Sequence, residues 1–210
     1  MNKIQIPENR IEQLIKEYEE THCIFLPDFV EKYVLQNMLT KLSKTQFQNK
    51  VEKEGDDEFG KVLALSSKDP GVFTFHLLMN DPNLFLLLER ITKCNKIGNF
   101  MGRIHRSVGD EKHEIDWHGD NSDTRLLAIT LNLGTELYSG ARFQIRKKGT
   151  QTVLREFGQT NAGDAFIFRI RPDLEHRLSP VEDGIRTVGV GWFRAQPDFA
   201  TFAKAYLKPF

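Results

Sequence analysis

The spacing of apolar residues predicts helices in the first half of the chain. A stripe with the i, i+3, i+4, i+7 spacing of an amphipathic helix begins after Pro7. A second helix is expected after Asp28, which suits an N-cap, and a third at Asp81–Pro82, because proline at the first helical position gives up no hydrogen bond. The expected buried positions are Ile11, Leu14, Ile15 and Tyr18 in the first helix, Val30, Tyr33, Val34, Met38 and Leu42 in the second, and Leu84, Phe85, Leu87, Leu88 and Ile91 in the third.

Two other parts of this half lack a helical period. Cys23–Pro27 is a short apolar run, which predicts a strand. Residues 43–69 are mostly polar, with charges clustered at Glu52–Glu58. This composition predicts a loop-rich and mobile segment.

From Gly98 onward the pattern changes to short runs of β-branched and aromatic residues, separated by turn residues about every ten positions. Ala141–Arg146 alternates apolar and polar residues, which is typical of a strand with one buried and one solvated face. The predicted strands are Gly98–Ser107, Glu114–His118, Leu126–Leu133, Ala141–Arg146, Thr152–Phe157, Asp164–Ile170, His176–Val181 and Thr187–Phe193.

Helices followed by short strands favour an α+β protein whose core is a double-sheet β-roll, with the helices packed on one sheet. No repeat, low-complexity tract or linker divides the 210 residues, so we expect one domain, 1–210. Residues 1–97 would supply most of the helical support and residues 98–194 the β-roll core. Residues 198–207 are expected to form a closing C-terminal helix.

Composition and charge narrow the class of protein without naming a function. The chain has 29 Lys and Arg against 29 Asp and Glu, so its zero net charge favours neither nucleic acid nor an acidic membrane surface as a partner. Its two cysteines, Cys23 and Cys94, cannot form a disulfide framework, and no stretch approaches the roughly 20 apolar residues of a membrane span. We therefore expect a cytoplasmic protein that binds neither nucleic acid nor a membrane. The sequence does not indicate the oligomeric state.

The segment Asp116–Asp120 carries the most informative chemistry. His118 and Asp120 lie two positions apart at the end of a predicted strand, so their side chains can point the same way. An imidazole nitrogen beside a carboxylate oxygen offers a divalent metal two adjacent ligands. A third ligand should come from a distant strand, and His176 is the candidate. Two histidines and one carboxylate are the ligand set of non-haem Fe(II) oxygenases.

A plainer interpretation is that His118 is a surface or hydrogen-bonded histidine, because a His-x-Asp pair arises readily by chance. Arg186 favours a functional site. It begins an apolar strand, where a buried guanidinium must be paired, and its planar fork fits a carboxylate. The partner is either Glu182 or Asp183, nearby in sequence, or the far carboxylate of a dicarboxylic cosubstrate.

Together these segments resemble the Fe(II)/2-oxoglutarate-dependent dioxygenases, particularly their prolyl 4-hydroxylase-like branch. The resemblance extends from about Cys23 to Arg194. It rests on His118–Asp120, Asn161–Phe168, Glu175–Arg177, Arg186, and the pair Leu131–Leu133 and Tyr138–Gly140. It implies a double-stranded β-helix core of the jelly-roll or cupin-like kind, Fe(II), O₂, and conversion of 2-oxoglutarate to succinate and CO₂.

The resemblance implies that His118, Asp120 and His176 ligate iron, with no catalytic residue beyond these ligands. Arg186 would pair with the C5 carboxylate of 2-oxoglutarate, where the prolyl 4-hydroxylase pattern has lysine and many other superfamily members have arginine. Asp120 also implies oxidation of a C–H bond rather than halogenation, because the halogenases of this superfamily lack the carboxylate ligand.

A tyrosine of this branch that often makes a second cosubstrate contact has no match in the sequence. Arg103 and His105, on one face of a predicted strand, are the nearest candidates, and a cross-strand pair is the alternative. Asn132 is a candidate hydrogen-bonding group in the site, although an asparagine at a strand end often caps a turn.

The implied function is a hydroxylase, or a related C–H-oxidising enzyme, with a small-molecule, amino-acid or peptide substrate. Two alternatives stay open: a hydroxylase acting on a residue of a folded protein partner, and a β-roll binding module without catalysis. Residues 43–69 and 109–115 are the candidate lids.

Overall fold

The computed structural model describes residues 6–54, 56–111, 113–122 and 124–195. The helices in this part of the chain are α1 (Glu8–Thr21), α2 (Lys32–Leu42), α3 (Pro70–Met79) and α4 (Pro82–Thr92), with the short 3-10 helix η1 (Gly109–Glu111). The strands are β1 (Cys23–Leu26), β2 (Gln48–Glu54), β3 (Asp57–Ala64), β4 (Ile97–Val108), β5 (Ile115–His118), β6 (Arg125–Asn132), β7 (Tyr138–Gly140), β8 (Phe143–Lys147), β9 (Val153–Phe157), β10 (Ala165–Arg169), β11 (Leu174–Leu178) and β12 (Val181–Ala195). None of the described helices has the length and hydropathy that a membrane span needs.

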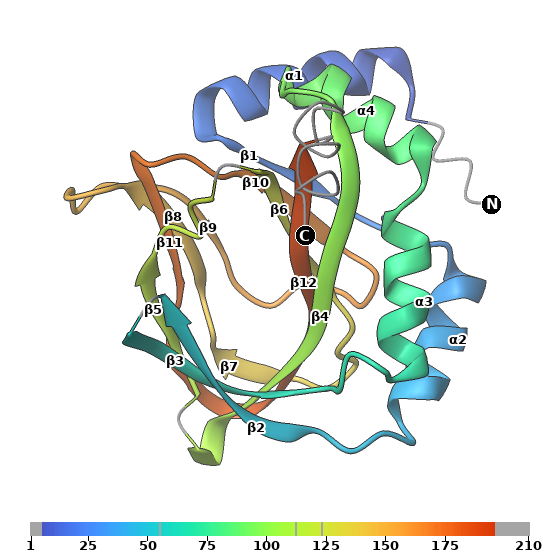
Figure 1. Ribbon diagram of the computed structural model, residues 1–210, viewed down its shortest axis with the longest axis vertical. Helices are drawn as coiled ribbons and strands as arrows, with labels where there is room; N and C mark the ends of the chain where they lie inside the picture. Colours follow the sequence, from blue (N-terminus) through green and yellow to red (C-terminus); the bar gives the residue numbers. More distant parts are fainter. Residues whose placement is uncertain (1–5, 55, 112, 123, 196–210) are drawn as a thin grey trace, which may run out of the picture.

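The strands form two layers that face each other (Figure 1). Neighbours pair in the order β1-β10-β6-β12-β4-β3-β5-β11-β8-β9, with β2 on β3 and β7 on β12. The first layer runs from β1 to β3, and the second contains β5, β11, β8 and β9. The order passes from one layer to the other where Gly60 of β3 pairs with Ile115 of β5. The predicted double-sheet β-roll is therefore confirmed.

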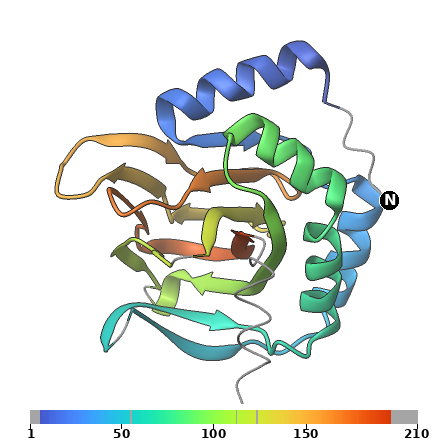
Figure 2. The same cartoon turned by 45° about the horizontal axis from the view of Figure 1, so that its top comes forward.

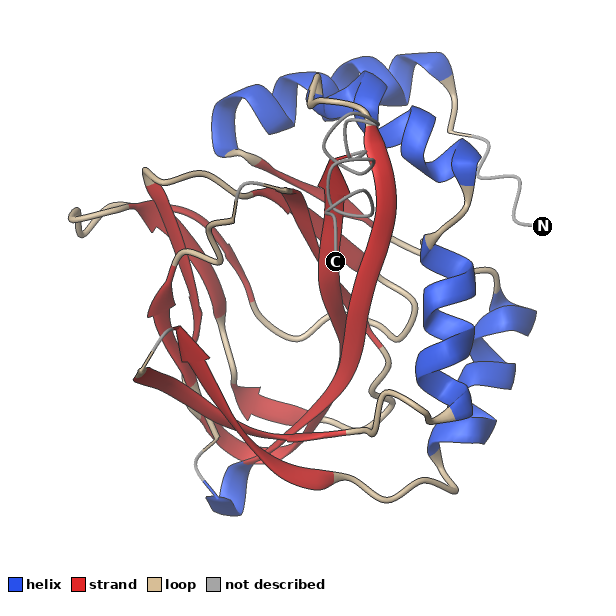
Figure 3. Cartoon of the chain, in the orientation of Figure 1, coloured by secondary structure: helices blue, strands red, loops and turns tan. Residues whose placement is uncertain are grey.

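Helices cover the first layer on the side away from the second (Figures 2 and 3). Phe75 of α3 is fully buried and makes an edge-to-face contact with Phe100 of β4, whose ring packs in turn against Phe193 of β12. Leu88 of α4 and Leu14 of α1 join the same apolar cluster. Burial of this cluster fixes the first layer against the helices.

Strand β6 shows how the sequence directs side chains to the site. Leu127, Ile129 and Leu131 belong to the cluster under the helices, whereas Ala128 belongs to the apolar cluster between the layers. Successive strand residues point to opposite faces, and here both faces are covered, so the whole run reads as apolar. Thr130 shares the inner face with Ala128 and lines a cavity between the layers.

The predicted loop over residues 43–69 is wrong in its larger part, which forms the β2–β3 hairpin. The hairpin joins the first layer where Leu63 and Ala64 of β3 pair with Arg106 and His105 of β4. The strands were not predicted because the hairpin is rich in charged residues. A buried carboxylate such as Glu52 depends on cationic partners that the local sequence does not reveal.

The helix predictions need two corrections. Asp28 is not the N-cap of α2, which begins four residues later. It lies in a left-handed turn (φ 49°), where its N–H donates to the Asp164 carboxylate. Tyr33, expected to be buried, is 78% exposed. The helix expected at Asp81–Pro82 is confirmed, and the Asp81 side chain caps it. Helix α3 was not predicted, and residues 198–207 lie outside the described part of the chain.

Candidate functional site

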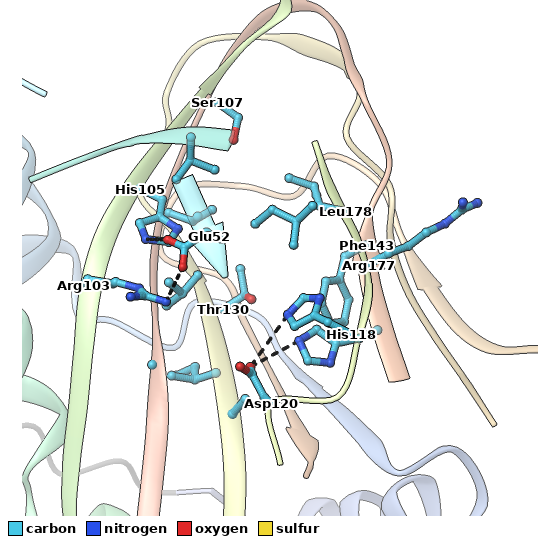
Figure 4. Close-up of a pocket in the computed structure, with 18 of the residues that line it drawn as sticks. Glu52, Arg103, His105, Ser107, His118, Asp120, Thr130, Phe143, Arg177 and Leu178 are labelled. Atoms are coloured by element: carbon cyan, nitrogen blue, oxygen red, sulfur yellow. Dashed lines mark hydrogen bonds and ion pairs between the residues drawn. The ribbon is translucent and has the colours of Figure 1, made fainter. Parts of the chain in front are cut away.

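Three metal-ligating side chains meet in the cavity between the layers. His118 ends β5, Asp120 follows two residues later, and His176 lies opposite His118 on β11. Their candidate ligand atoms all lie within 4.8 Å of one another. Oδ2 of Asp120 is 3.4 Å from Nε2 of His176 and 4.0 Å from Nε2 of His118 (Figure 4). The structure thus brings together the three residues that the sequence singled out.

The protonation of His118 suits a metal ligand. Its Nδ1 lies 2.8 Å from the backbone oxygen of Asp116, and since a carbonyl only accepts, Nδ1 carries the hydrogen. Burial, and then the neighbouring His176, lower the pKa of His118 to about 4, so the ring is neutral at pH 7. Nε2 therefore presents a free lone pair to Asp120 and His176.

Asp120 reaches the site by a turn rather than by strand alternation. β5 ends at His118, and Asp120 adopts the left-handed conformation (φ 54°), which aspartate tolerates better than most residues. Burial by itself would raise the pKa of the Asp120 carboxyl. Hydrogen bonding and charge from His176 outweigh that effect and lower its pKa below the ordinary range, so the group is a carboxylate.

Two side chains from the first layer hold the Asp120 carboxylate. Trp192 of β12 donates from Nε1 to Oδ2 over 2.8 Å, and Arg125 of β6 donates from one terminal nitrogen to Oδ1 over 3.0 Å. The Arg125 guanidinium also lies 3.8 Å from the centre of the Trp192 ring. Such contacts orient a ligating group and limit its rotation.

Arg186 lines the same cavity. Its side chain is buried and hydrogen-bonds the Tyr138 hydroxyl, and it makes no ion pair within the described residues. Burial lowers the pKa of Arg186, and Tyr138 opposes this shift. Neither Glu182 nor Asp183 pairs with the guanidinium, and both are exposed. The alternative of a local salt bridge is therefore wrong.

The wall opposite His118 carries a charged cluster (Figure 4). Glu52 of β2 is 5% exposed, and its Oε2 accepts from a terminal nitrogen of Arg103 at 2.8 Å. Its Oε1 lies 3.1 Å from Nζ of Lys50 and 3.4 Å from Nε2 of His105. Burial, followed by the charge on Arg103, keeps the pKa of His105 well below its usual range. Arg103 and His105 therefore face the cavity together, as their shared strand face predicts.

Asn132 does not reach the cavity. Its Nδ2 donates to the Thr160 oxygen at 2.6 Å, and its Oδ1 accepts from the Gly134 N–H at 3.0 Å. The amide nitrogen is therefore bonded to the loop before β10, and the amide oxygen to the turn after β6. The structure thus gives Asn132 the turn-capping role.

Sequence reasoning missed four residues of the site. Tyr138 was noted only as part of the segment Tyr138–Gly140, and nothing in the sequence connects it with Arg186. Trp192 and Arg125 approach Asp120 from two adjacent strands, a contact that depends on register. Glu52 lay in the supposed loop, and only strand prediction for 48–64 would have identified it.

The three residues fit a divalent metal. They offer one carboxylate oxygen and imidazole nitrogens from separate segments, and no further His, Cys, Asp or Glu of the described chain joins the group. Two histidines and one carboxylate leave positions for other ligands, as in non-haem Fe(II) sites. The surrounding cavity lies between the two layers and brings these polar groups together with apolar side chains such as Phe143, Phe168 and Leu178.

No protein-family model and no curated protein matches the sequence. Solved structures do share the fold. An oxidoreductase of the 2OG-Fe(II) oxygenase family from Burkholderia pseudomallei superposes with a TM-score of 0.66 at 13% identity, over 91% of this chain and 93% of that one. A Pseudomonas putida prolyl-4-hydroxylase gives 0.64 at 12% identity, over 88% of this chain and 98% of that one. A Trichoplax adhaerens prolyl hydroxylase, in complex with a hypoxia inducible factor peptide fragment, gives 0.65 at 12% identity, over 96% and 94%. The fold is that of the 2OG-Fe(II) oxygenases, and the predicted double-stranded β-helix core is confirmed.

Proposed function

We propose that the protein is an Fe(II)- and 2-oxoglutarate-dependent dioxygenase that hydroxylates, or otherwise oxidises, an unactivated C–H bond of a small-molecule, amino-acid or peptide substrate. Succinate and CO₂ are released in this reaction. The shared fold makes the chemistry possible, and the contents of the cavity support it, because a fold alone does not determine a function.

The proposal rests mainly on the burial of Arg186 and on its lack of an anionic partner. A buried guanidinium is costly unless it is paired with an anion, and Arg186 contacts the Tyr138 hydroxyl but no carboxylate among the described residues. The cavity that holds Arg186 also holds His118, Asp120 and His176. A dicarboxylic acid could bind a metal held by these three residues through one end and pair with the Arg186 guanidinium through the other.

The residues divide into those that hold the metal and those that orient the cosubstrate. His118, Asp120 and His176 would hold Fe(II), and when bound this metal supplies the activation of O₂. Arg186, with Tyr138 fixing its guanidinium, holds the far carboxylate of 2-oxoglutarate. His105 lies on the adjoining wall and stays a predicted second contact, whereas Asn132 has no such place because its amide is engaged elsewhere.

The cavity walls protect the reacting groups from water. Leu178 and Val188 are buried and line the inner cavity. Phe59 of the β2–β3 hairpin stacks on the His118 ring with centroids 4.2 Å apart. The hairpin thus covers one ligand, and exclusion of water strengthens every charge interaction inside the cavity.

An anaerobic titration with Fe(II) and 2-oxoglutarate tests the proposal. A weak metal-to-ligand charge-transfer band should appear in the visible and should vanish in His176→Ala. Arg186→Ala should weaken 2-oxoglutarate binding while iron binding survives. If the native protein shows no band, and releases no succinate under O₂ with candidate substrates, the proposal fails.

A matched control separates a local effect of Arg186 from a general loss of structure. Arg171 is exposed, pairs with Asp173 and does not line the cavity, so Arg171→Ala should bind 2-oxoglutarate like the native protein. Equal loss of iron and 2-oxoglutarate in Arg186→Ala would mean that the arginine is structural. We infer a cytoplasmic location from the cysteine content alone.

A further inference from the structure

The outer part of the cavity contains more positive than negative charge. It is lined by Glu52, Arg103, Arg125 and Trp192, and it reaches His118 and Asp120. Lys50 adds a third cation through its contact with Glu52. Arg103, Arg125 and Lys50 therefore share two carboxylates, Glu52 and Asp120, and Asp120 is a candidate metal ligand. Lys53 also lines the region and pairs with the exposed Glu58.

Arg103 has unused hydrogen-bonding capacity in this region. One terminal nitrogen donates to Glu52 at 2.8 Å, and the guanidinium lies 5.0 Å from the centre of the Trp192 ring. Its Nε is buried and has no hydrogen-bond partner among the described residues. A guanidinium has five N–H donors, so a large part of this fork is available to a ligand.

His105 marks the inner limit of this region. The residue is 4% exposed, faces the cavity, and its Nε2 has no hydrogen-bond partner within the described chain. Buried polar atoms are normally satisfied, so the unpartnered Nε of Arg103 indicates a missing polar partner in the outer region. Nε2 of His105 instead lies 3.4 Å from Oε1 of Glu52, in the inner cavity that also holds Arg186. The two residues are two positions apart on β4 and share its inner face.

This region is separate from the place proposed for 2-oxoglutarate. Arg186 pairs in the register with Ser107, four residues beyond Arg103 on β4, which places the two arginines about 13 Å apart along the strand at ~3.3 Å per residue. Arg125, on β6, lies on the other side of β12 from Arg103. The two outer arginines thus flank Trp192 beside the metal-binding residues.

We infer that Arg103, assisted by Arg125, binds an anionic group of the substrate, a carboxylate or a phosphate, at the mouth of the cavity. The inference rests on the proposed function, because it specifies the substrate class of that enzyme. Glu52 orients Arg103 from behind and partly neutralises Lys50. The crowding of like charges supports this assignment, since burial and then Arg103 lower the pKa of Lys50.

Small anions test the site without a known substrate. The Trp117→Phe protein, in which Trp192 is the single remaining tryptophan, is saturated with Zn(II) and 2-oxoglutarate. It is titrated with sulfate, as a model of phosphate, and separately with acetate, at constant ionic strength. A saturable change in Trp192 fluorescence is expected with at least one anion, and the tighter of the two identifies the group.

Arg103→Met should weaken that anion's binding by about tenfold or more, the loss expected for a charged hydrogen bond. Arg103→Lys keeps the charge and should retain binding within a few-fold, which guards against misfolding of the methionine variant. Arg171→Met is the matched control and should bind as the parent does. Equal binding by the parent and Arg103→Met would identify an adventitious ion only and overturn the inference, as would no saturable response to either anion.

A parallel titration with methylammonium tests the opposite assignment, in which Glu52 receives a cationic substrate. A saturable response that Glu52→Gln abolishes would overturn the inference. These fluorescence measurements need no turnover, so their failure is distinct from the absence of the Fe(II) and 2-oxoglutarate band.

Discussion

Trp192 donates its indole N–H to Oδ2 of Asp120 at 2.8 Å, the same oxygen that lies 3.4 Å from His176. Trp192 stands six residues after Arg186 on β12. One strand therefore supplies both the cation proposed to hold the cosubstrate and the donor that fixes the carboxylate ligand. The spacing of these two functions is set by a single rigid element.

We expect Trp192→Phe to weaken divalent-metal binding by about tenfold, because loss of a contact that orients a ligand typically costs 10- to 100-fold in affinity. The ring volume is largely kept, and only the donor to Asp120 is removed. Competition with a chromophoric chelator measures the Zn(II) affinity of the protein without turnover. Trp117→Phe is the matched control, because the Trp117 indole contacts Arg146 and Arg177 instead of Asp120. Equal affinities in the two variants would contradict the role of Trp192.

Much of the β-roll could be predicted because its strands have a local pattern. Ala141–Arg146 alternates, and its core, Phe143 and Ile145, faces inward as expected. β6 has both faces buried and reads as a continuous apolar run. In each case the burial of a side chain follows from its own hydrophobicity, so it can be predicted from a single sequence.

The charged wall of the cavity could not be predicted in this way. Glu52 of β2 is buried because Lys50 contacts it from its own strand and Arg103 reaches it from β4, on the far side of β3. A pattern of hydrophobic residues does not reveal such a charged cluster. Similarly, His118 and Asp120 were recognisable as a pair, whereas Trp192 depends on a long-range contact. The burial of polar side chains depends on contacts that form only in the folded protein, so it leaves little pattern in the local sequence.

The hydrogen bond between Tyr138 and Arg186 leads to a prediction for 2-oxoglutarate binding. Tyr138→Phe removes the hydroxyl that fixes the buried guanidinium, so we expect 2-oxoglutarate to dissociate about tenfold more readily, at the scale of a hydrogen bond to a charged group. Calorimetry on the Zn(II)-loaded protein measures this affinity. Tyr33→Phe alters an exposed tyrosine and should have no effect. An unchanged affinity in Tyr138→Phe would show that Arg186 is positioned without its help.

Asp164 leads to a prediction for stability. Its buried carboxylate accepts from the N–H groups of Asp28 and Asn161, both at 2.9 Å, and so ties the turn between β1 and α2 to the loop before β10. Asp164→Ala should lower the free energy of unfolding by about 2 kcal/mol, because two part-buried N–H groups lose their carboxylate acceptor. Urea denaturation measures the change. Asp173→Ala, at an exposed side chain, should cost less than about 1 kcal/mol. Similar losses in the two variants would contradict the bridging role.

His105 leads to a prediction for the pH dependence of stability. Burial, with the positive charges of Arg103, Lys50 and Arg186, keeps the folded-state pKa of His105 well below its ordinary value of 6.5, although Glu52 faces the ring. As the pH falls below 6.5 the unfolded chain therefore takes up a proton that the folded chain does not, and stability is lost. His105→Gln removes this loss. Urea unfolding of the metal-free protein at pH 7.5 and 5.5 should show a smaller acid-dependent fall in the variant, by up to about 1.4 kcal/mol per pH unit below 6.5. Parallel pH profiles for the two proteins would mean that His105 titrates equally in the folded and unfolded states.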